Sequence, residues 1–565
     1  DLQFFDNLLP RYRCFTPSGL SEAMLNSRTR RYWPGGDVHS QVFLARYPDK
    51  KLLIRMARLA ARRRIEYWHP WHMEQTHSSY RLGKQIDWFT PPNGDHEWID
   101  SLVRFTHMLD LAAAYRLTKK PLYLRSFDSY LASFSKSRGR PGRHWKYRLN
   151  AAIRITNLIR AYDLVAGAKT LSLDTHMAVH ENLFADIRFL AASLEDTKGN
   201  GAFFITTALL TATEYLGDFF QVDEWSKPAE ARLYEIIDSE LQSDGIEAEQ
   251  VPMYHGQVVL VLLDYFVVLV ANERPVSDKL KRTVTKMLDV LCGLCDPQGY
   301  IPPIGDSDRF PVSYITRFFN AVLDAANSRD AEHSVETTAT PKVPGICRLT
   351  TFEDTGWVVA RWDYGRGTQG YLLFDCSGKP GNGYGYHSHA DDLQFLLHTT
   401  NGPIFTEPGR FTYCKDFKAF FPFTRKRIFP SGRLRPLYSL AFPAFMDLKS
   451  RNWREYFQRT LSHNTISMDG ENQPRYSSYL ETGPEVVLHS SLSIGPLVLV
   501  EGRFDSNSSV YSCDLPESSP MPGYQHRRTL VGYLPNLWII VDQVKSVEEH
   551  KWISSYHTDV RYEVS

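Results

Sequence analysis

The sequence predicts an α+β protein made of an N-terminal helical domain, residues 1–335, and a C-terminal antiparallel β-sandwich, residues 346–565. Three observations predict this. In the first part, apolar residues recur at helical spacing between polar turns. Residues 336–345 are polar and poor in apolar side chains, as linkers are. Beyond them, short β-type runs alternate with turns. A chain of 565 residues also exceeds the usual size of one core.

Helices are predicted at 103–117, 151–165, 204–215 and 257–271, because apolar residues in these stretches recur on one helix face. The longest apolar run, Val258 to Ala271, is interrupted by Asp264 and is too short to span a bilayer. We therefore expect a buried helix there and no membrane span.

The sandwich is carried by short runs of β-branched and aromatic residues between turns, at 356–362, 371–374 and 537–542. Such runs are typical of antiparallel sheets packed face to face. The sequence leaves open whether the sandwich is complete at its C-terminal end.

Composition narrows the classes of function. A hydrophobic content of 43% and a charged content of 23% are those of a folded domain. Aromatic residues reach 13%, which suits either sugar-binding platforms or large buried cores. The net charge of +1 gives no global field for a polyanion, so an acidic ligand would need local clusters such as 425–427. No nucleic-acid-binding motif is present, and we expect no nucleic-acid partner.

The most informative segment is GYGYHSHADD at residues 383–392. His387 and His389 lie two positions apart, before a run that reads as a strand at 393–397. In a strand, side chains at this spacing share one face. Two imidazoles on one face can hold a metal, a proton-transfer group, or one of each.

Two further motifs follow in order, FTEPGRFTY at 405–413 and LSHNTISMDG at 461–470. Together the three resemble the C-terminal β-domain of the heparinase II/III family of polysaccharide lyases. Glu407 stands where that family prefers Asp, a departure that keeps a carboxylate.

The N-terminal part resembles the same family through short motifs at 85–88, 97–105, 198–201, 249–255 and 303–308. Many relatives carry His directly after the Asn of the KGNG element, where this chain has Gly201. A catalytic histidine at that position is therefore excluded. The resemblance implies that the helices form an (α/α) toroid.

The resemblance also implies a reaction, β-elimination in a uronate polymer, and the residues for it. Asn200 would neutralise the uronate carboxylate, Tyr254 would protonate the leaving oxygen, and His387 would be the catalytic histidine. Whether Tyr254 or His387 is the base stays open. From the residues alone, Asn200 could merely form a left-handed turn and Tyr254 could be a core tyrosine.

His389, Glu407 and His463 match the metal site of the family. Two imidazoles and one carboxylate suit zinc better than calcium. Because these residues are remote in sequence, we expect a structural role that orients His387. The alternative is that His463 caps a turn with Asn464. No organic cofactor is expected.

Five further residues are predicted to bind substrate: Trp98, Arg104, Arg154, His255 and Tyr413. The arginines have the chemistry to bind a carboxylate or sulfate, but on helices they could equally form salt bridges. Asp306 and Asp308 are expected to cap and brace a loop.

The predicted function is a polysaccharide lyase acting on a glycosaminoglycan, with heparan sulfate or its unsulfated precursor first. Hyaluronan, chondroitin or alginate are alternatives for the same fold. Two alternatives belong to other classes of protein. One is a hydrolase with paired carboxylates about 5–9.5 Å apart, and the other is a non-catalytic polysaccharide-binding protein. The resemblance implies a bacterial periplasmic or secreted location. The oligomeric state does not follow from the sequence.

Overall fold

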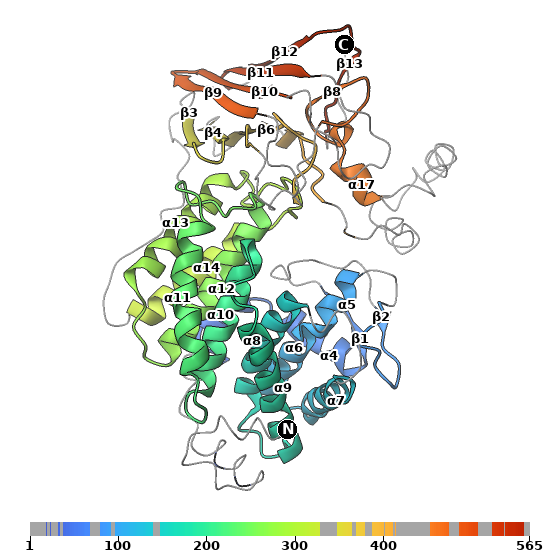
Figure 1. Cartoon of the computed structure of the whole chain (residues 1–565), viewed down its shortest axis with the longest axis vertical. Helices are drawn as coiled ribbons and strands as arrows, with labels where there is room; N and C mark the ends of the chain where they lie inside the picture. The colour runs from blue at the N-terminus through green and yellow to red at the C-terminus, as the bar shows by residue number, and fades with distance from the viewer. Residues whose placement is uncertain are drawn as a thin grey trace.

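The helices within residues 41–327 and the strands within residues 347–554 occupy opposite ends of the molecule (Figure 1). The computed structural model describes residues 19, 23, 32–33, 38–67, 80–91, 96–138, 147–327, 347–363, 369–378, 387–399, 402–410, 413, 453–473, 485–506, 523–535 and 537–558. The last helix of the first part ends at Asn327, and the first strand of the second begins at Cys347. The predicted linker 336–345 and the basic cluster at 425–427 lie outside the described residues.

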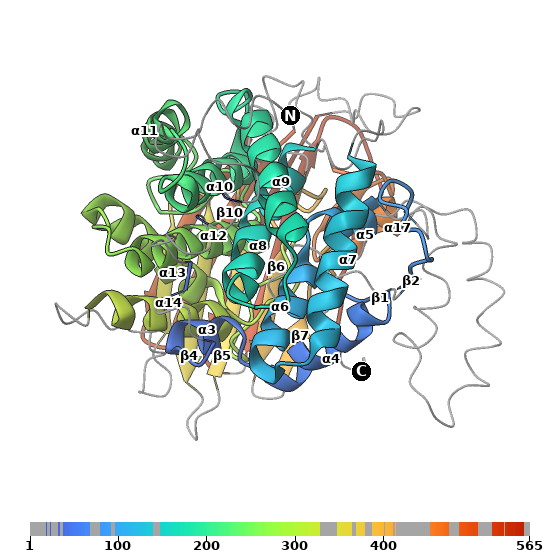
Figure 2. The same cartoon turned by 90° about the horizontal axis from the view of Figure 1, so that it is seen from below.

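The helices pack as an inner and an outer layer. They are α3 (Gln41–Arg46), α4 (Lys50–Ala61), α5 (His96–Val103), α6 (Thr106–Thr118), α7 (Pro121–Ser137), α8 (Arg148–Val165), α9 (Leu173–Ala191), α10 (Gly199–Leu216), α11 (Asp223–Ser239), α12 (Pro252–Ala271), α13 (Asp278–Leu294) and α14 (Val312–Asn327). Contacts run from α4 through α6, α8, α10, α12 and α14 to α3, which precedes α4 in the chain. The inner helices thus close a ring, seen from below in Figure 2, and the predicted toroid is confirmed.

The bounds of the predicted helices differ from expectation. The stretch 103–117 is not one helix, because Phe105 has φ +64° and separates α5 from α6. Helix α12 starts earlier than expected, with Pro252 in its first turn, where proline is well tolerated. By length and composition α12 could cross a membrane, but 83% of its most apolar window is buried inside the fold. It is apolar all round because it belongs to the inner ring.

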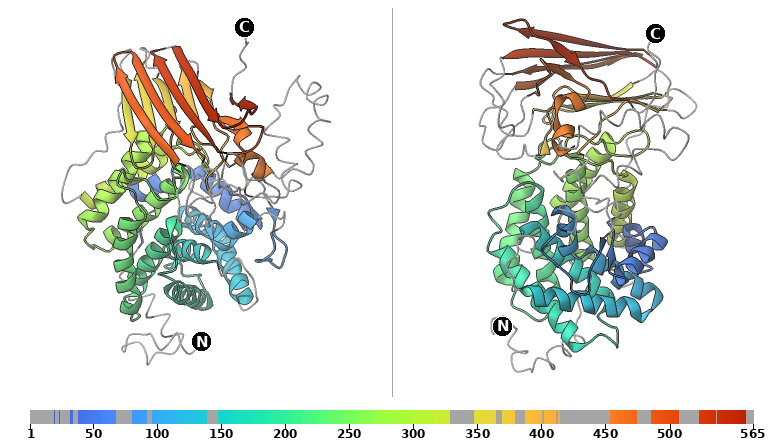
Figure 3. Two further views of the ribbon diagram at one scale, coloured as in Figure 1. Left: turned by 45° about the horizontal axis from the view of Figure 1, so that its top comes forward. Right: turned by 90° about the vertical axis from the view of Figure 1, so that its right-hand side faces the viewer.

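The second part is a sandwich of antiparallel sheets (Figure 3). One sheet has the order β3-β4-β5-β6-β7, built from β3 (Cys347–Phe352), β4 (Trp357–Asp363), β5 (Gln369–Asp375), β6 (Phe395–Thr399) and β7 (Gly402–Phe405). The other has the order β12-β11-β10-β9, built from β9 (Glu485–Ile494), β10 (Leu497–Asp505), β11 (Tyr524–Tyr533) and β12 (Leu537–Ser546). A short pair joins β8 (Ile466–Met468) to β13 (Trp552–Ser554), and a two-residue pair joins β1 (Arg64–Ile65) to β2 (Tyr80–Arg81).

The burial of the two sheets explains their sequence patterns. Strand β4 is buried at six consecutive positions because one face packs on the other sheet and its opposite face packs on α13. Strands β10 and β11 alternate between buried and less buried positions, because one of their faces points away from the core. Tyr371 of β5 donates to the Leu294 carbonyl at the end of α13 at 2.7 Å, so the sheet is fixed to the helical part.

Candidate functional site

Three side chains meet where the helical part faces the sandwich. Tyr254 comes from the first turn of α12, and the Met253 N–H beside it donates to Ser307 Oγ at 3.1 Å. The Tyr254 hydroxyl lies 3.4 Å from His387 Nδ1 and forms a hydrogen bond with the Tyr413 hydroxyl. The Tyr254 and His387 rings meet edge to face, with centroids 4.8 Å apart.

His387 and His389 lie in a loop before the predicted strand, so strand geometry does not set their orientation. Strand β6 begins only at Phe395, and Leu393 has φ +60°. The two histidine rings are nevertheless held close together, because each binds a different oxygen of the same carboxylate. His387 Nδ1 is 2.8 Å from Asp306 Oδ2, and His389 Nε2 is 2.9 Å from Asp306 Oδ1.

Asp306 is the centre of this network, which is more than the expected capping of a loop. It is 0% exposed and forms a two-point ion pair with Arg454 of α17 (Trp453–Gln458). Gly305 allows the Asp306 loop to lie against the His387 backbone. A Cβ on residue 305 would stand 2.7 Å from the His387 carbonyl oxygen, and residue 305 has φ +56°. Burial alone would raise the pKa of Asp306, but the Arg454 charge and the histidine hydrogen bonds hold it well below its usual value.

His387 is oriented by carboxylates on both ring nitrogens. Its Nδ1 faces Asp306, and its Nε2 lies 3.8 Å from Glu249 Oε2. Burial alone would lower the pKa of His387, but the hydrogen bond and charge of Asp306, with the charge of Glu249, raise it above its usual value. The side chain keeps 31% of its surface exposed, so a ligand can reach it.

Asn200 lies in the first turn of α10, across Glu249 from His387. Its backbone N–H donates to Glu249 Oε1 at 2.8 Å.

The left-handed residue of this turn is Gly199, with φ +61°, and not Asn200. The alternative that Asn200 itself forms a left-handed turn is therefore wrong.

The other four predicted substrate-binding residues are buried. Trp98 is 0% exposed and packs edge to face against Tyr67 and Tyr80. Arg154 is 0% exposed and holds Asp186 through two hydrogen bonds of 2.8 and 2.9 Å. Side chains without exposed surface are held by the core, so neither is carried into the proposal below.

Arg104 and His255 are also interior. Arg104 donates to Asn150 Oδ1 at 2.8 Å and lies 3.7 Å from Glu97. His255 bonds the Met287 carbonyl at 2.8 Å through Nε2, and burial lowers its pKa to about 4. Of the five residues predicted to bind substrate, the structure brings Tyr413 to Tyr254 and His387.

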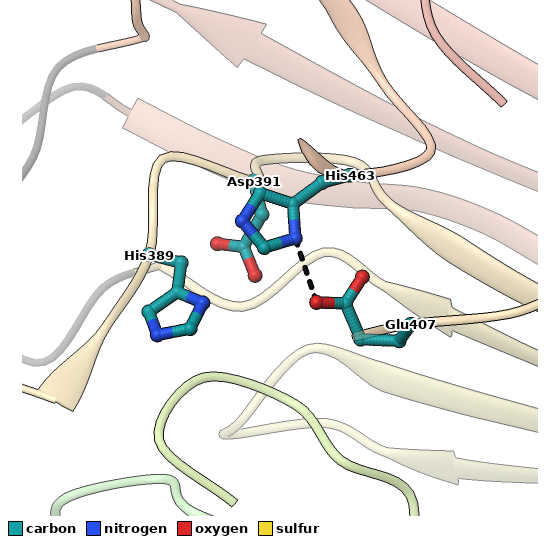
Figure 4. A group of neighbouring side chains, drawn as sticks. All are labelled: His389, Asp391, Glu407 and His463. Atoms are coloured by element: carbon teal, nitrogen blue, oxygen red, sulfur yellow. Dashed lines mark hydrogen bonds and ion pairs between the residues drawn. The ribbon is translucent and has the colours of Figure 1, made fainter. Parts of the chain in front are cut away.

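A second group lies behind His387, where four buried side chains converge (Figure 4). His389 and Asp391 come from the loop before β6, Glu407 follows β7, and His463 follows the 3-10 helix η6 (Thr460–Ser462). One ligand atom from each lies within 4.8 Å of all the others. His463 Nδ1 and Glu407 Oε1 form a hydrogen bond of 2.6 Å.

The donor set fits a divalent transition metal. His389 Nε2 bonds Asp306, so its Nδ1 remains for a ligand, and that atom is buried without a hydrogen-bond partner among the described residues. Burial lowers the pKa of His389 to about 4, which keeps the imidazole neutral, as metal ligation requires. Burial raises the pKa of Glu407 to about 7, against the lowering effect of His463. Two nitrogens and two carboxylates suit zinc among the common ions.

Several residues of the site were not predicted as site residues. Asp391 lies two positions after His389 in the same motif and could have been chosen as a fourth ligand. Asp306 lies in the motif at 303–308, which predicted only that it would brace a loop. Arg454 lies in no motif, so its ion pair with Asp306 follows only from the folded chain.

Comparison with known proteins matches both parts of the chain. The family model described as Heparinase II/III N-terminus matches residues 48–331, and the model described as Heparinase II/III-like, C-terminal matches residues 348–565. A search of curated proteins gave no match.

Similar solved structures include a heparinase III, 16% identical, with a TM-score of 0.71 over 98% of this chain and 80% of that chain. A heparinase III gene product is 16% identical, with a TM-score of 0.59 over 97% and 77%. A heparan sulfate lyase from Pedobacter heparinus is 15% identical, with a TM-score of 0.55 over 97% and 79%. At these identities the likeness shows the fold.

Proposed function

This chain belongs to the heparinase II/III family of polysaccharide lyases, and from that premise we propose that it cleaves a uronate-containing glycosaminoglycan by β-elimination. The observation that carries the proposal is the meeting of Tyr254, His387 and Tyr413, with Asn200 joined to them through Glu249. These side chains come from both parts of the chain, so the site lies between domains, where ligand clefts are common.

The residues can perform each step of the elimination. The C5 proton of a uronate becomes acidic only when its carboxylate is hydrogen-bonded, which the Asn200 amide would do. A base, Tyr254 or His387, takes the C5 proton, and the electron pair forms the C4–C5 double bond. The C4–O4 bond breaks, and the Tyr254 hydroxyl donates a proton to the departing O4. The hydrogen bond with Tyr413 orients the Tyr254 hydroxyl.

The preferred substrate is heparan sulfate or its unsulfated precursor. Two of the similar structures are a heparinase III and a heparan sulfate lyase, which supports this choice. Arg410 and Arg454 stand 4.6 and 4.5 Å from the Tyr413 ring centre, but both are buried and paired with Asp308 and Asp306, so they hold the Tyr413 ring in place. Hyaluronan, chondroitin and alginate are the alternatives to be tested. A periplasmic or secreted location in a bacterium is proposed with this function.

A hydrolase would need two accessible acids facing each other. Among the residues that the structure describes, the carboxylates that lie within ion-pair distance of His387 are Glu249 and Asp306. Asp306 is fully buried and ion-paired with Arg454, so it is not available to protonate or attack a glycosidic bond. This favours elimination over hydrolysis.

The reaction type is tested with a panel of acidic polysaccharides. Each digest should gain the absorbance of an unsaturated uronate as the chain shortens, with heparan sulfate or its precursor cleaved fastest. Shortened chains that carry only saturated ends would contradict the elimination. Intact polymers that still bind would favour the non-catalytic binding protein.

His389, Asp391, Glu407 and His463 would hold the metal, which we propose to be zinc. Bound there, it would tie together the loops before β6, after β7 and before β8, and so fix the loop that carries His387. No step of the elimination is assigned to it.

Removal of the metal is therefore expected to lower stability and activity together. Chelation should lower the melting temperature, and zinc should restore it. His389→Ala should lower the melting temperature and abolish its response to zinc. As a control, His557→Ala removes a partly exposed histidine bonded to the Leu461 carbonyl and should keep the response. A purified protein that contains no metal and whose melting temperature does not respond to zinc would contradict the site.

A further inference from the structure

One carboxylate contacts two of the three candidate catalytic residues and lies close in sequence to the third. Glu249 lies five positions before Tyr254, bonds the Asn200 N–H through Oε1, and lies 3.8 Å from His387 Nε2 through Oε2. We propose that Glu249 is a positioning residue that sets Asn200 and His387 relative to Tyr254. The inference rests on the proposed function and deepens it.

The contact with Asn200 fixes the start of α10. The first N–H groups of a helix have no partner within the helix, and Lys198 at the N-cap supplies no side-chain bond. Two remote carboxylates serve instead, Glu240 for the Gly199 N–H at 3.0 Å and Glu249 for the Asn200 N–H at 2.8 Å. A negative charge at this end of a helix is favourable.

The space for the carboxylate is reserved by Gly199. A Cβ at this position would stand 2.3 Å from Glu249 Oε1. Residue 199 therefore has to be glycine both for its φ of +61° and for the close approach of Glu249.

The contact with His387 uses the second oxygen. Glu249 Oε2 is buried and has no hydrogen-bond partner among the described residues, so it is not committed to the helix end. With Asp306 on Nδ1 and Glu249 on the Nε2 side, the ring of His387 is held from both edges. If Glu249 only capped α10, its Oε2 atom would not need to face His387 of the sandwich.

The test separates the two contacts by comparing Glu249→Gln with Glu240→Gln. Both variants keep an amide oxygen that can accept from the same helix end, but only the first removes a charge beside His387. We expect Glu249→Gln to lower kcat by about 10²-fold, the scale of a small misplacement of reacting groups, with KM within about twofold. Glu240→Gln should keep kcat within about twofold. The assay follows unsaturated uronate on the substrate that the wild type cleaves best.

Failure of the positioning role can be distinguished from failure of the proposed function. Wild-type kcat in Glu249→Gln, or an equal loss in both variants, overturns the positioning role while elimination stands. If the wild type forms no unsaturated ends, the proposed function fails, and crystal structures of the wild type and Glu249→Ala decide the inference. Displaced Asn200 and His387 side chains support it; unchanged ones overturn it.

Discussion

Tyr254→Phe is expected to reduce kcat by about 10²-fold or more, the usual scale for an acid–base group, with little change in folding. The substitution removes only the hydroxyl, which contacts Tyr413 and lies 3.4 Å from His387. The ring stays in place against His387, because its edge-to-face packing does not involve the hydroxyl. The measurement is the initial rate of unsaturated uronate formation at saturating substrate.

A matched control is Tyr130→Phe. Tyr130 is also a buried tyrosine, and its hydroxyl donates to the Ala60 carbonyl at 2.9 Å, far from the site in the helical part. This variant should lose stability of about 1 kcal/mol and keep its kcat. Near wild-type turnover of Tyr254→Phe on each substrate that the protein cleaves would contradict the assigned proton donor.

The same variants separate the two candidates for the base. If the C5 proton and the leaving oxygen lie on one side of the sugar ring, Tyr254 can perform both transfers and His387 positions it. If they lie on opposite sides, His387 is the base. Comparing Tyr254→Phe and His387→Ala on glucuronate-rich and iduronate-rich polymers distinguishes these cases.

Sequence periodicity predicted the helices because burial of one helix face leaves a pattern in the chain itself. It failed at residues 103–117, where the left-handed Phe105 breaks a continuous apolar pattern. The ordered motifs led to Asn200, Tyr254 and His387. The structure joins Asn200 to His387 through Glu249 and places Tyr254 beside His387. The run after the motif forms the predicted strand from Phe395 onward, but His387 and His389 precede it in a loop, where Asp306 orients their side chains.

Residue chemistry alone could not separate buried from exposed polar groups. Arg154 has the side chain of a carboxylate-binding residue, yet its carboxylate is Asp186 of the neighbouring helix. Trp98 has the ring of a sugar platform but lies in the aromatic core. The roles of Asp306 and Glu249 depend on partners about fifty or more positions away, which a local pattern does not show.

Asp306→Ala is expected to lower the free energy of unfolding by about 3–5 kcal/mol, because it leaves the buried Arg454 charge without its partner. It also removes the acceptor of His387 and His389, so activity should fall with stability. Urea unfolding at pH 7 measures the change. Asp308→Asn is the control from the same loop, since its ion pair with Arg410 is partly exposed, and it should cost about 1 kcal/mol or less.

The pH dependence of that loss identifies its electrostatic part. Because the pKa of Asp306 is held below its unfolded value, its stabilisation is complete above that value, about 3.9, and is lost as the pH falls through the folded pKa. The difference between wild type and Asp306→Ala should therefore be largest near neutral pH and should shrink in acid. A difference that is small at pH 7, or that does not change with pH, would show that the contacts of Asp306 with Arg454 and the two histidines do not hold the loops of the site together.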